Sequence, residues 1–238
     1  MAVAALAMFF ASLAFLPIPA LAAGREEAAA AAARPRLEKK LAGLKAQAGA
    51  PVFLRIFKEE STLEVWLKPK GAGRYILFKS YPICAWSGSL GPKTKEGDRQ
   101  APEGFYAVGL KHLNPYSSYH LSFDLGYPNA YDKAQGYTGN LLMVHGDCRS
   151  DGCYAMTNSG IEEIYTLVKA ALDNGQPFFR VHCFPFRLTP QNLERHKNKT
   201  WRGFWRTLEP VYTYFETNHL PPEVAVESGR YRISGAGQ

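Results

Sequence analysis

The amino-acid sequence predicts a β-rich α+β domain with a few helices and long loops. Two observations lead to this prediction. Between residues 52 and 83, apolar and polar residues alternate, and β-branched and aromatic residues are frequent. Helical periodicity is confined to shorter segments. With 238 residues, 46% of them hydrophobic and 13% aromatic, the chain is too apolar for a disordered protein and long enough for one large core.

The first 22 residues are expected to act as a signal peptide. This stretch carries no charge, its apolar run ends at Pro17, and Ala20-Leu21-Ala22 offers small residues with the spacing of a cleavage site. A membrane anchor is the rival interpretation, but Pro17 and Pro19 interrupt the run before it reaches the roughly 20 apolar residues of a spanning helix. The usual Lys or Arg before the apolar run is missing. The apolar run and the spacing of the cleavage site still favour export, so we expect a secreted protein.

The net charge indicates which kinds of partner the protein could bind, and the cysteine content limits the number of disulfides. A formal charge of +7 favours an anionic partner such as an acidic polymer or a membrane surface. No dense Lys/Arg run or nucleic-acid motif is present, so we expect no nucleic-acid partner, and a solvated basic surface is the simpler interpretation. Of Cys84, Cys148, Cys153 and Cys183, at most one pair can form a disulfide if one must stay a free thiol.

Residues 23–50 are expected to form an Ala-rich linker followed by a short helix. The stretch 23–33 offers no apolar face to bury, whereas the leucines from Leu37 to Leu44 recur at helical spacing before Gly49. The main domain is expected to follow.

That main domain is expected to span residues 51–190. Three strand-like segments, 52–58, 62–68 and 74–83, are separated by turn residues and predict a β-meander. Residues 87–104 are rich in Gly, Pro and charge, which predicts a loop, and a further strand begins at Gly104.

The second half of this domain is expected to carry the function. A long irregular stretch, 114–139, is typical of a functional loop. A short buried strand at 141–144 leads to His145. The 3.6-residue period from Ile161 to Leu172 predicts a helix, and residues 177–188 predict another strand.

Residues 191–238 are expected to form a C-terminal extension packed on the domain. Its aromatic run from Trp201 to Leu208 has helical spacing and is expected to pack in the core, ending at Pro210. No internal repeat is visible.

The segment from His145 to Thr157 carries the chemistry. Cys153 follows a polar loop and is expected to lie just before a helix, whose N-terminus would stabilise its thiolate. The His145 imidazole can take the thiol proton. Gly152 lets a substrate approach backbone amides, which could bind the oxyanion of a tetrahedral intermediate.

Two other interpretations of the same residues remain open. Cysteine is commonly a small buried residue without chemistry. A metal site is the other, because histidines and cysteines are suitable ligands, but their spacing does not fit the paired arrangement of structural zinc. The chain also lacks a Gly-rich phosphate loop after a strand, so we expect no metal and no cofactor. The residues considered as ligands are His145, Cys148, Cys153, His182 and Cys183.

The same segment resembles the active-site signature of the YkuD-type L,D-transpeptidases. His145-Gly146 and Ser150-x-Gly152-Cys153 match that signature. Residues 145–157 also resemble the string His-Gly-x-Cys-x-Ser-x-Gly-Cys-Tyr-Ala-Met-Thr of a YafK-like subgroup. The resemblance covers about residues 52 to 190 and includes the segments 81–93, 101–106, 117–123 and 126–131.

This resemblance implies a mixed β-sandwich or barrel with the cysteine at one end. It implies that Cys153 attacks the amide carbonyl at the L-centre of diaminopimelate in a peptidoglycan stem peptide. A thioester acyl-enzyme would form, and an amine or water would resolve it. His145 matches the base, Ser150 the residue that orients the imidazole, and Gly152 the backbone near the oxyanion.

Two positions depart from the family pattern. Most members carry a second histidine where Asp151 stands, and Arg or Asn where Ala155 stands. Recognition of the stem carboxylates must then come from other residues. Arg149 and Arg187 are candidates by charge, and His120, Tyr131 and Tyr154 are candidates to line the cleft, although each could equally be an ordinary surface or packing residue.

The expected function is a periplasmic peptidoglycan enzyme. The YafK-like subgroup is associated with hydrolytic release of a lipoprotein attached to the wall through a lysine, which favours cleavage of a diaminopimelate–lysine bond. One alternative is an L,D-transpeptidase that forms crosslinks or attaches the lipoprotein. The alternative from another class is a peptidoglycan-binding module without turnover. Expected partners are stem peptides and a wall-anchored lipoprotein.

Overall fold

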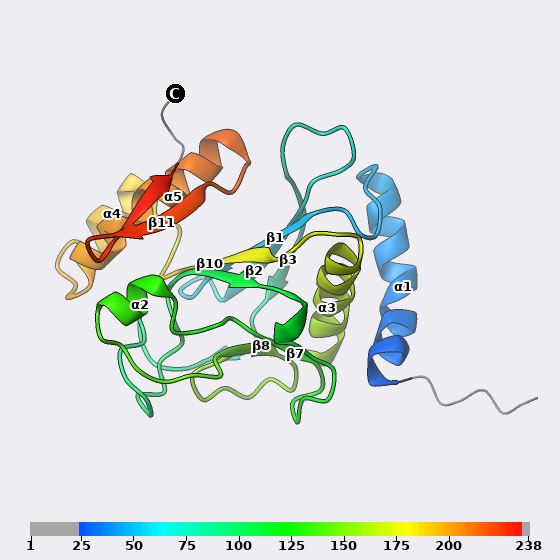
Figure 1. Ribbon diagram of the computed structural model, residues 1–238, viewed down its shortest axis with the longest axis horizontal. Helices are drawn as coiled ribbons and strands as arrows, with labels where there is room; N and C mark the ends of the chain where they lie inside the picture. The colour runs from blue at the N-terminus through cyan, green and yellow to red at the C-terminus, as the bar shows by residue number, and fades with distance from the viewer. Residues whose placement is uncertain (1–23, 235–238) are drawn as a thin grey trace, which may run out of the picture.

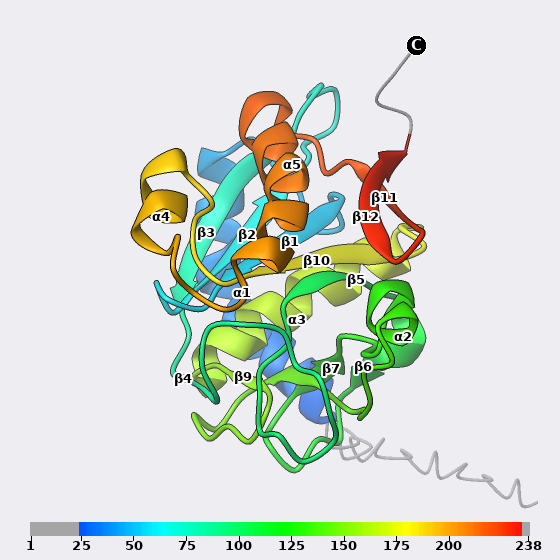
Figure 2. The ribbon, with the colours of Figure 1, turned by 90° about the vertical axis from the view of Figure 1, so that its left-hand side faces the viewer.

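The computed structural model describes residues 24–234, which fold around two five-stranded sheets (Figures 1 and 2). The first sheet has the order β3-β2-β1-β10-β5, and only its β1–β10 pair is parallel. The predicted β-meander is confirmed as β1, β2 and β3. The strands are β1 (Val52–Phe57), β2 (Thr62–Leu67), β3 (Ile76–Pro82), β5 (Gly104–Val108) and β10 (Phe179–Phe184).

The second sheet has the order β4-β9-β8-β7-β6 and is built from strands of two or three residues. Its β8–β9 pair is parallel. The region 114–139, predicted to be irregular throughout, contains β7 and the short helix α2 (Ala130–Ala134). The elements are β4 (Ala85–Trp86), the 3-10 turn η1 (Leu110–His112), β6 (Leu113–Asn114), β7 (Ser122–Asp124), β8 (Met143–His145) and β9 (Tyr154–Ala155).

Helix α3 (Asn158–Asp173) lies between the two sheets and fills the main core (Figure 2). The Thr157 hydroxyl caps its first turn by accepting the Gly160 N–H at 3.1 Å. Its apolar face meets both sheets through residues that include Ile161, Ile164 and Val168, as the 3.6-residue period predicts.

The Ala-rich segment is helical, which corrects the prediction of a linker at 23–33. It forms the first half of α1 (Arg25–Gly43), which runs alongside α3 (Figure 1). Ala29 and Ala33 are buried at this contact, where small side chains let the two helices approach closely. Arg36 anchors the pair of helices through a 2.6 Å contact with Glu163.

The C-terminal residues cover the other face of the first sheet. Helix α5 (Arg202–Asn218) packs there through buried aromatic residues such as Trp205, and it continues through Pro210, where the sequence predicted an end. Strand β1 is therefore buried on both faces, including Arg55, which pairs with Glu216 at 2.7 Å. The remaining elements are α4 (Pro190–Arg195), β11 (Glu223–Glu227) and β12 (Arg230–Ser234).

A buried ion pair holds the long loop 87–103 against the first sheet. Lys58 Nζ lies 3.0 Å from Glu103 Oε1, and both side chains are fully buried. Glu103 also accepts hydrogen bonds from the Gly91 N–H and from the Trp205 indole. Burial lowers the pKa of Lys58, and Glu103 opposes that shift. The loop thus has a fixed base in the core.

Within residues 24–234, no helix is long and apolar enough to cross a bilayer. The predicted signal peptide, residues 1–22, lies outside the described residues.

Candidate active site

Strand register brings His145 and Cys153 to the same side of the second sheet. In the parallel β8–β9 pair, Val144 is opposite Tyr154 and His145 is opposite Ala155. Cys153 directly precedes β9, and its Sγ lies 3.4 Å from the N–H of Met143, the first residue of β8. Because side chains alternate along a strand, His145 and Cys153 lie on one face, two register positions apart, while Val144 and Tyr154 point into the core.

The His145 ring is arranged as a neutral base. Its Nδ1 lies 2.6 Å from the Gly146 carbonyl, which can only accept, so Nδ1 carries the proton and Nε2 keeps a free lone pair. Burial lowers the pKa of His145, and the Gly146 contact and Asp147 oppose that shift. Tyr119 packs over the imidazole with ring centroids 4.7 Å apart. An imidazole in this state can accept a proton at neutral pH.

The Cys153 thiol is half-buried, and its raised pKa means that it would need a base to become a thiolate at neutral pH. Burial raises its pKa, and the nearby carboxylates Asp124 and Asp151 raise it further, against the Met143 N–H and Lys93. The Met143 N–H lies 3.4 Å from Sγ. Among the described residues, no hydrogen bond joins Sγ to the His145 ring, and apo enzymes often form such contacts only with substrate bound.

The position of the helix relative to Cys153 differs from the prediction. Strand β9 follows the cysteine directly, and α3 begins only at Asn158. A helix dipole acts mainly within its first turn, so the sequence-based argument for thiolate stabilisation by a helix N-terminus does not hold here. The prediction failed because a two-residue strand gives no periodic signal.

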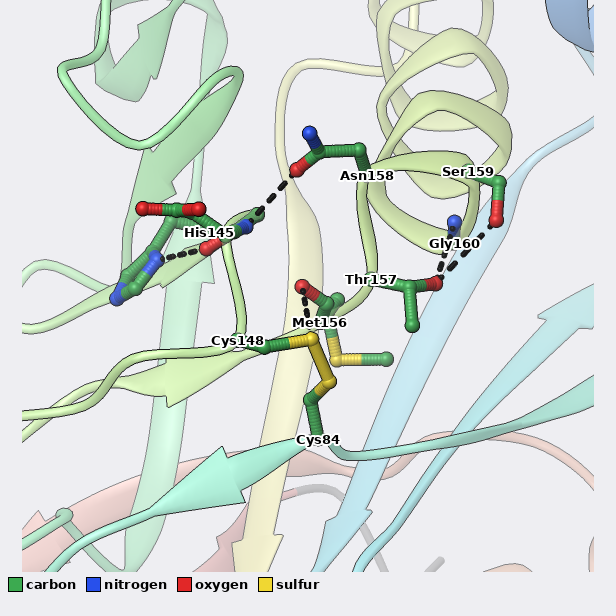
Figure 3. The surroundings of a disulfide bond; sticks show 10 residues. Cys84, His145, Cys148, Met156, Thr157, Asn158, Ser159 and Gly160 are labelled. Carbon is green, nitrogen blue, oxygen red and sulfur yellow. Dashed lines mark hydrogen bonds between the residues drawn. A yellow bond between two sulfur atoms is a disulfide. The ribbon is translucent and has the colours of Figure 1, made fainter.

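A disulfide ties down the loop between the base and the nucleophile (Figure 3). Cys84 and Cys148 are bonded, with Cα atoms 5.0 Å apart and a sequence separation of 64. The same loop is held where Asn158 Oδ1 accepts the Asp147 N–H at 2.9 Å. Cys148 is therefore paired with Cys84, and Cys153 is a free thiol.

Ser150 and Gly152 make hydrogen bonds that hold the loop. The Ser150 hydroxyl donates to the Cys153 carbonyl at 2.7 Å and contacts Ser87, whereas the His145 ring contacts the Gly146 carbonyl, so the predicted role of Ser150 in orienting His145 stays a prediction. The Gly152 N–H donates to the Ser87 hydroxyl and is not free for an oxyanion. Its φ of +98° favours glycine. No sequence pattern pointed to Ser87, which lies 65 residues away.

Three of the predicted substrate contacts have other partners in the structure. Tyr154 is fully buried on the face opposite Cys153 and donates to the Pro102 carbonyl. Tyr131 stacks on Tyr231 of the C-terminal hairpin at 4.4 Å. Arg187 pairs with Glu64 at 2.6 Å on the first sheet. Strand alternation, applied to Cys153 and its neighbour, could have excluded Tyr154 in advance.

His120 and Arg149 remain close to the loop. His120 Nε2 contacts Glu162 at 3.0 Å, and its side chain lines a pocket of about 500 Å³ together with Asp147 and Asn158. Arg149 is exposed. Both stay candidates for substrate contact.

A second pocket of about 330 Å³ opens on the other end of the loop, next to the thiol. Gly152 and Leu141 line it, and the Leu141 carbonyl lies 3.9 Å from Cys153 Sγ. Lys93 and Arg99 add positive charge to its wall. Neither cation was predicted, because each lies in a loop distant in sequence from the nucleophile.

The residues considered as metal ligands do not form a common site. Among residues 24–234, no three His, Cys, Asp or Glu side chains are grouped so that they could hold an ion. Cys148 is in the disulfide, and Cys183 is buried in the first sheet. His182 lies beside it with neither ring nitrogen hydrogen-bonded within the described residues.

The chain is similar to known proteins. Residues 54–177 match the family described as the L,D-transpeptidase catalytic domain, YkuD. Over 186 residues, the chain is 50% identical to YafK of Escherichia coli strain K12, whose name classes it with the L,D-transpeptidases; the match covers 78% of this chain and 75% of the relative.

Two solved structures also align with it. Pgp2 of Campylobacter jejuni, a helical cell shape determining protein, aligns over 81% of this chain and 80% of its own, with 17% identity and a TM-score of 0.44. Bd1075 of Bdellovibrio bacteriovorus aligns over 71% of this chain and 63% of its own, with 20% identity and a TM-score of 0.40.

Proposed function

Since the chain belongs to the family of L,D-transpeptidase catalytic domains, which act on peptidoglycan peptides, we propose that Cys153 is its nucleophile and His145 its base. The observation that carries this proposal is the shared face of β8 and β9. There a free thiol stands two register positions from an imidazole whose proton is fixed on Nδ1. A binding module would have no need for that arrangement.

In the proposed reaction, His145 Nε2 takes the Cys153 proton as Sγ attacks the amide carbonyl at the L-centre of diaminopimelate. A carbon–sulfur bond forms, and the carbonyl oxygen becomes an oxyanion. Since the Gly152 N–H is engaged by Ser87, the Cys153 N–H is the donor we assign to this oxyanion. The carbon–nitrogen bond then breaks, and protonated His145 returns the proton to the leaving amine.

The thioester is then resolved by water or by an amine. We propose water, because the string from His145 to Thr157 resembles the subgroup associated with release of a lysine-linked lipoprotein. His145 removes a proton from the water as it attacks, and Cys153 leaves as the thiol. The leaving amine of the first step would be the lipoprotein lysine. Transpeptidation remains the alternative that the family favours.

We further propose that the protein works in the periplasm after removal of residues 1–22. Two features support an oxidising compartment: the Cys84–Cys148 disulfide and the signal-like apolar stretch.

The test is incubation of the purified mature protein with sacculi that carry bound lipoprotein, followed by mass spectrometry of released and retained peptides. The Cys153→Ala variant is compared with Cys183→Ala, which removes the other free thiol, buried in the first sheet. Release by wild type and Cys183→Ala, but not by Cys153→Ala, supports the hydrolase. New diaminopimelate crosslinks or exchanged amino acids would instead identify a transpeptidase. Sacculus binding without any Cys153-dependent change would leave only the binding module.

A further inference from the structure

The pocket beside Cys153 carries charges that the proposed bond cleavage does not use. Lys93, Arg99 and Glu96 line it, together with Gly152 of the active-site loop. It shares no lining residue with the pocket at His120, and the two open at opposite ends of the loop 146–152. The thiol therefore has a distinct charged cavity on one side.

Lys93 is held rigidly in the wall of this cavity. The side chain is buried, and Nζ donates to Asp98 Oδ1 at 2.6 Å and to the Lys95 carbonyl at 2.9 Å. An ammonium has three hydrogens, so within the described residues one remains without an acceptor. Gly139 lies against the end of this side chain, where a Cβ would come within 2.9 Å of Lys93 Cε. A larger residue there would crowd the end of the Lys93 side chain.

Arg99 stands at the mouth of the same cavity. It pairs with Asp151 at 3.5 Å, and both side chains are mostly exposed. An exposed pair of this kind is weak and easily exchanged. Asp151 lies two residues before Cys153. A carboxylate that enters the pocket could therefore replace Asp151 as the partner of Arg99.

The direction of the reaction decides which part of the substrate enters. The leaving amine must receive its proton from His145, so it lies on the His145 side of the thiol. The acyl part then extends to the other side, toward Lys93. When the L-centre of diaminopimelate is the acyl group, its side chain ends in a D-centre with a free carboxylate and an amine.

Resting on the proposed function, we propose that this pocket binds the D-centre of diaminopimelate, with Lys93 and Arg99 holding its carboxylate. Glu96 offers a counter-charge for the amine. The assignment supplies the carboxylate recognition that Ala155 cannot provide. It also agrees with the effect of Lys93 on the thiol, whose pKa that cation lowers.

The first test measures charge selectivity at Cys153 without any peptidoglycan. Alkylation of Cys153 by iodoacetate and by iodoacetamide is followed by mass spectrometry in a Cys183→Ala background. Relative to wild type, Lys93→Gln should lower the iodoacetate/iodoacetamide rate ratio on the order of tenfold, and Arg99→Gln should lower it less. Lys95→Gln makes the same charge change in the same loop outside the pocket and should leave the ratio unchanged.

Loss of Lys93 leaves Asp98 without its charged partner, although Asp98 still accepts the Thr94, Lys95 and Gln100 N–H groups. The double variant Lys93→Gln/Asp98→Asn is net neutral at this pair, as wild type is, so its ratio should fall by a smaller factor than that of Lys93→Gln. Unchanged ratios in both this variant and Arg99→Gln would overturn the proposal.

The second test uses two soluble stem peptides that differ only in whether the D-centre carboxylate is free or amidated. Wild type should show a KM on the order of tenfold higher for the amidated peptide, and Arg99→Gln should discriminate less. Equal turnover of both peptides by wild type would refute the pocket assignment while leaving Cys153 catalysis intact. Failure on both peptides and on sacculi would instead count against the proposed function.

Discussion

The two sheets are built in different ways. The first has strands of five to seven residues, paired over four to six positions, with one irregularity between β2 and β3, and its central strand is buried on both faces. The second has strands of two or three residues. It is held instead by individual contacts: the Cys84–Cys148 disulfide, the Ser87 hydroxyl and the Asn158 amide at the start of α3.

This difference separates stability from chemistry. Burial and ladder hydrogen bonds in the first sheet set the free energy of unfolding. The candidate active site lies on the second sheet, where its geometry depends on a few individual bonds. Changes in the first sheet should therefore unfold the protein, whereas changes in the second should alter the thiol before they alter the fold.

The largest effect is expected from Glu103→Ala in the first sheet's ion pair. The variant leaves the Lys58 charge buried without a partner, which typically costs about 3–5 kcal/mol of unfolding free energy. Urea unfolding followed by circular dichroism measures it. Glu209→Ala, which removes an exposed pair with Arg206 on α5, is the control and should cost less than about 1 kcal/mol. A similar loss of unfolding free energy in both variants would contradict the idea that the buried pair contributes more to stability than the exposed pair.

A smaller effect is expected from Cys148→Ala, which opens the disulfide beside the nucleophile. Loss of such a bond costs about 2–4 kcal/mol. Hydrogen exchange should show reduced protection in β8 and β9, with β1 and β10 less affected, and the alkylation rate of Cys153 should change. Cys84→Ala should reproduce this result. If protection fell equally in both sheets, the second sheet would not be an independently held unit.

His145 on the second sheet and His182 on the first are buried, and each should make stability depend on pH. Burial lowers the pKa of His145 and drives that of His182 well below the usual 6.5. The unfolded chain then binds more protons below pH 6.5, so stability falls as pH falls, at up to about 1.4 kcal/mol per pH unit for each histidine. His182→Leu should flatten this slope in urea unfolding between pH 6.5 and 5 and leave Cys153 alkylation unchanged. An unchanged slope would show that His182 does not contribute.

The same comparison predicts how activity depends on pH. Since His145 must be neutral to accept the thiol proton, its lowered pKa should keep turnover constant just below pH 6.5, with a decline only at lower pH. The profile of kcat/KM on a stem peptide measures this. A decline centred above pH 6.5 would mean that burial does not lower the pKa of His145.

The smallest effect on stability is expected from Arg25→Ala on α1. Arg25 donates to the Ser117 and His120 carbonyls at 2.7 and 2.9 Å, and the loop between them carries Tyr119, which packs on His145. The variant should cost about 1 kcal/mol or less, yet shift the pH dependence of Cys153 alkylation. Arg34→Ala on the same helix is the control. Identical pH profiles for the two variants would contradict a link from α1 to the base.

The first sheet was largely predictable from sequence, and the second was not. Alternation over residues 52–83 and the 3.6-residue period after Ile161 identified β1 to β3 and α3, because long elements repeat their pattern. The strand that follows Cys153 has two residues, which is too short to show an alternation of apolar and polar residues. The first half of α1 was missed because its buried residues are alanines, whose small size hides an apolar face, whereas the leucines of its second half gave a helical pattern.

The candidate site was predictable only where one local string carried it. His145 and Cys153 follow from the motif, and strand register then places them on one face. The partners of the loop come from elsewhere: Ser87 from a segment 65 residues away and Lys93 from another part of the same long loop. Contacts of that kind depend on tertiary folding and leave no pattern in a single sequence.

The Cys84–Cys148 bond also makes oxidation a maturation step. A chain still in a reducing compartment has the nucleophile and the base but not the covalent anchor on the loop between them. Under the proposed function, the loop between them is anchored covalently only after an oxidant has closed this bond. Synthesis of the chain and completion of the proposed active site would then be separate events.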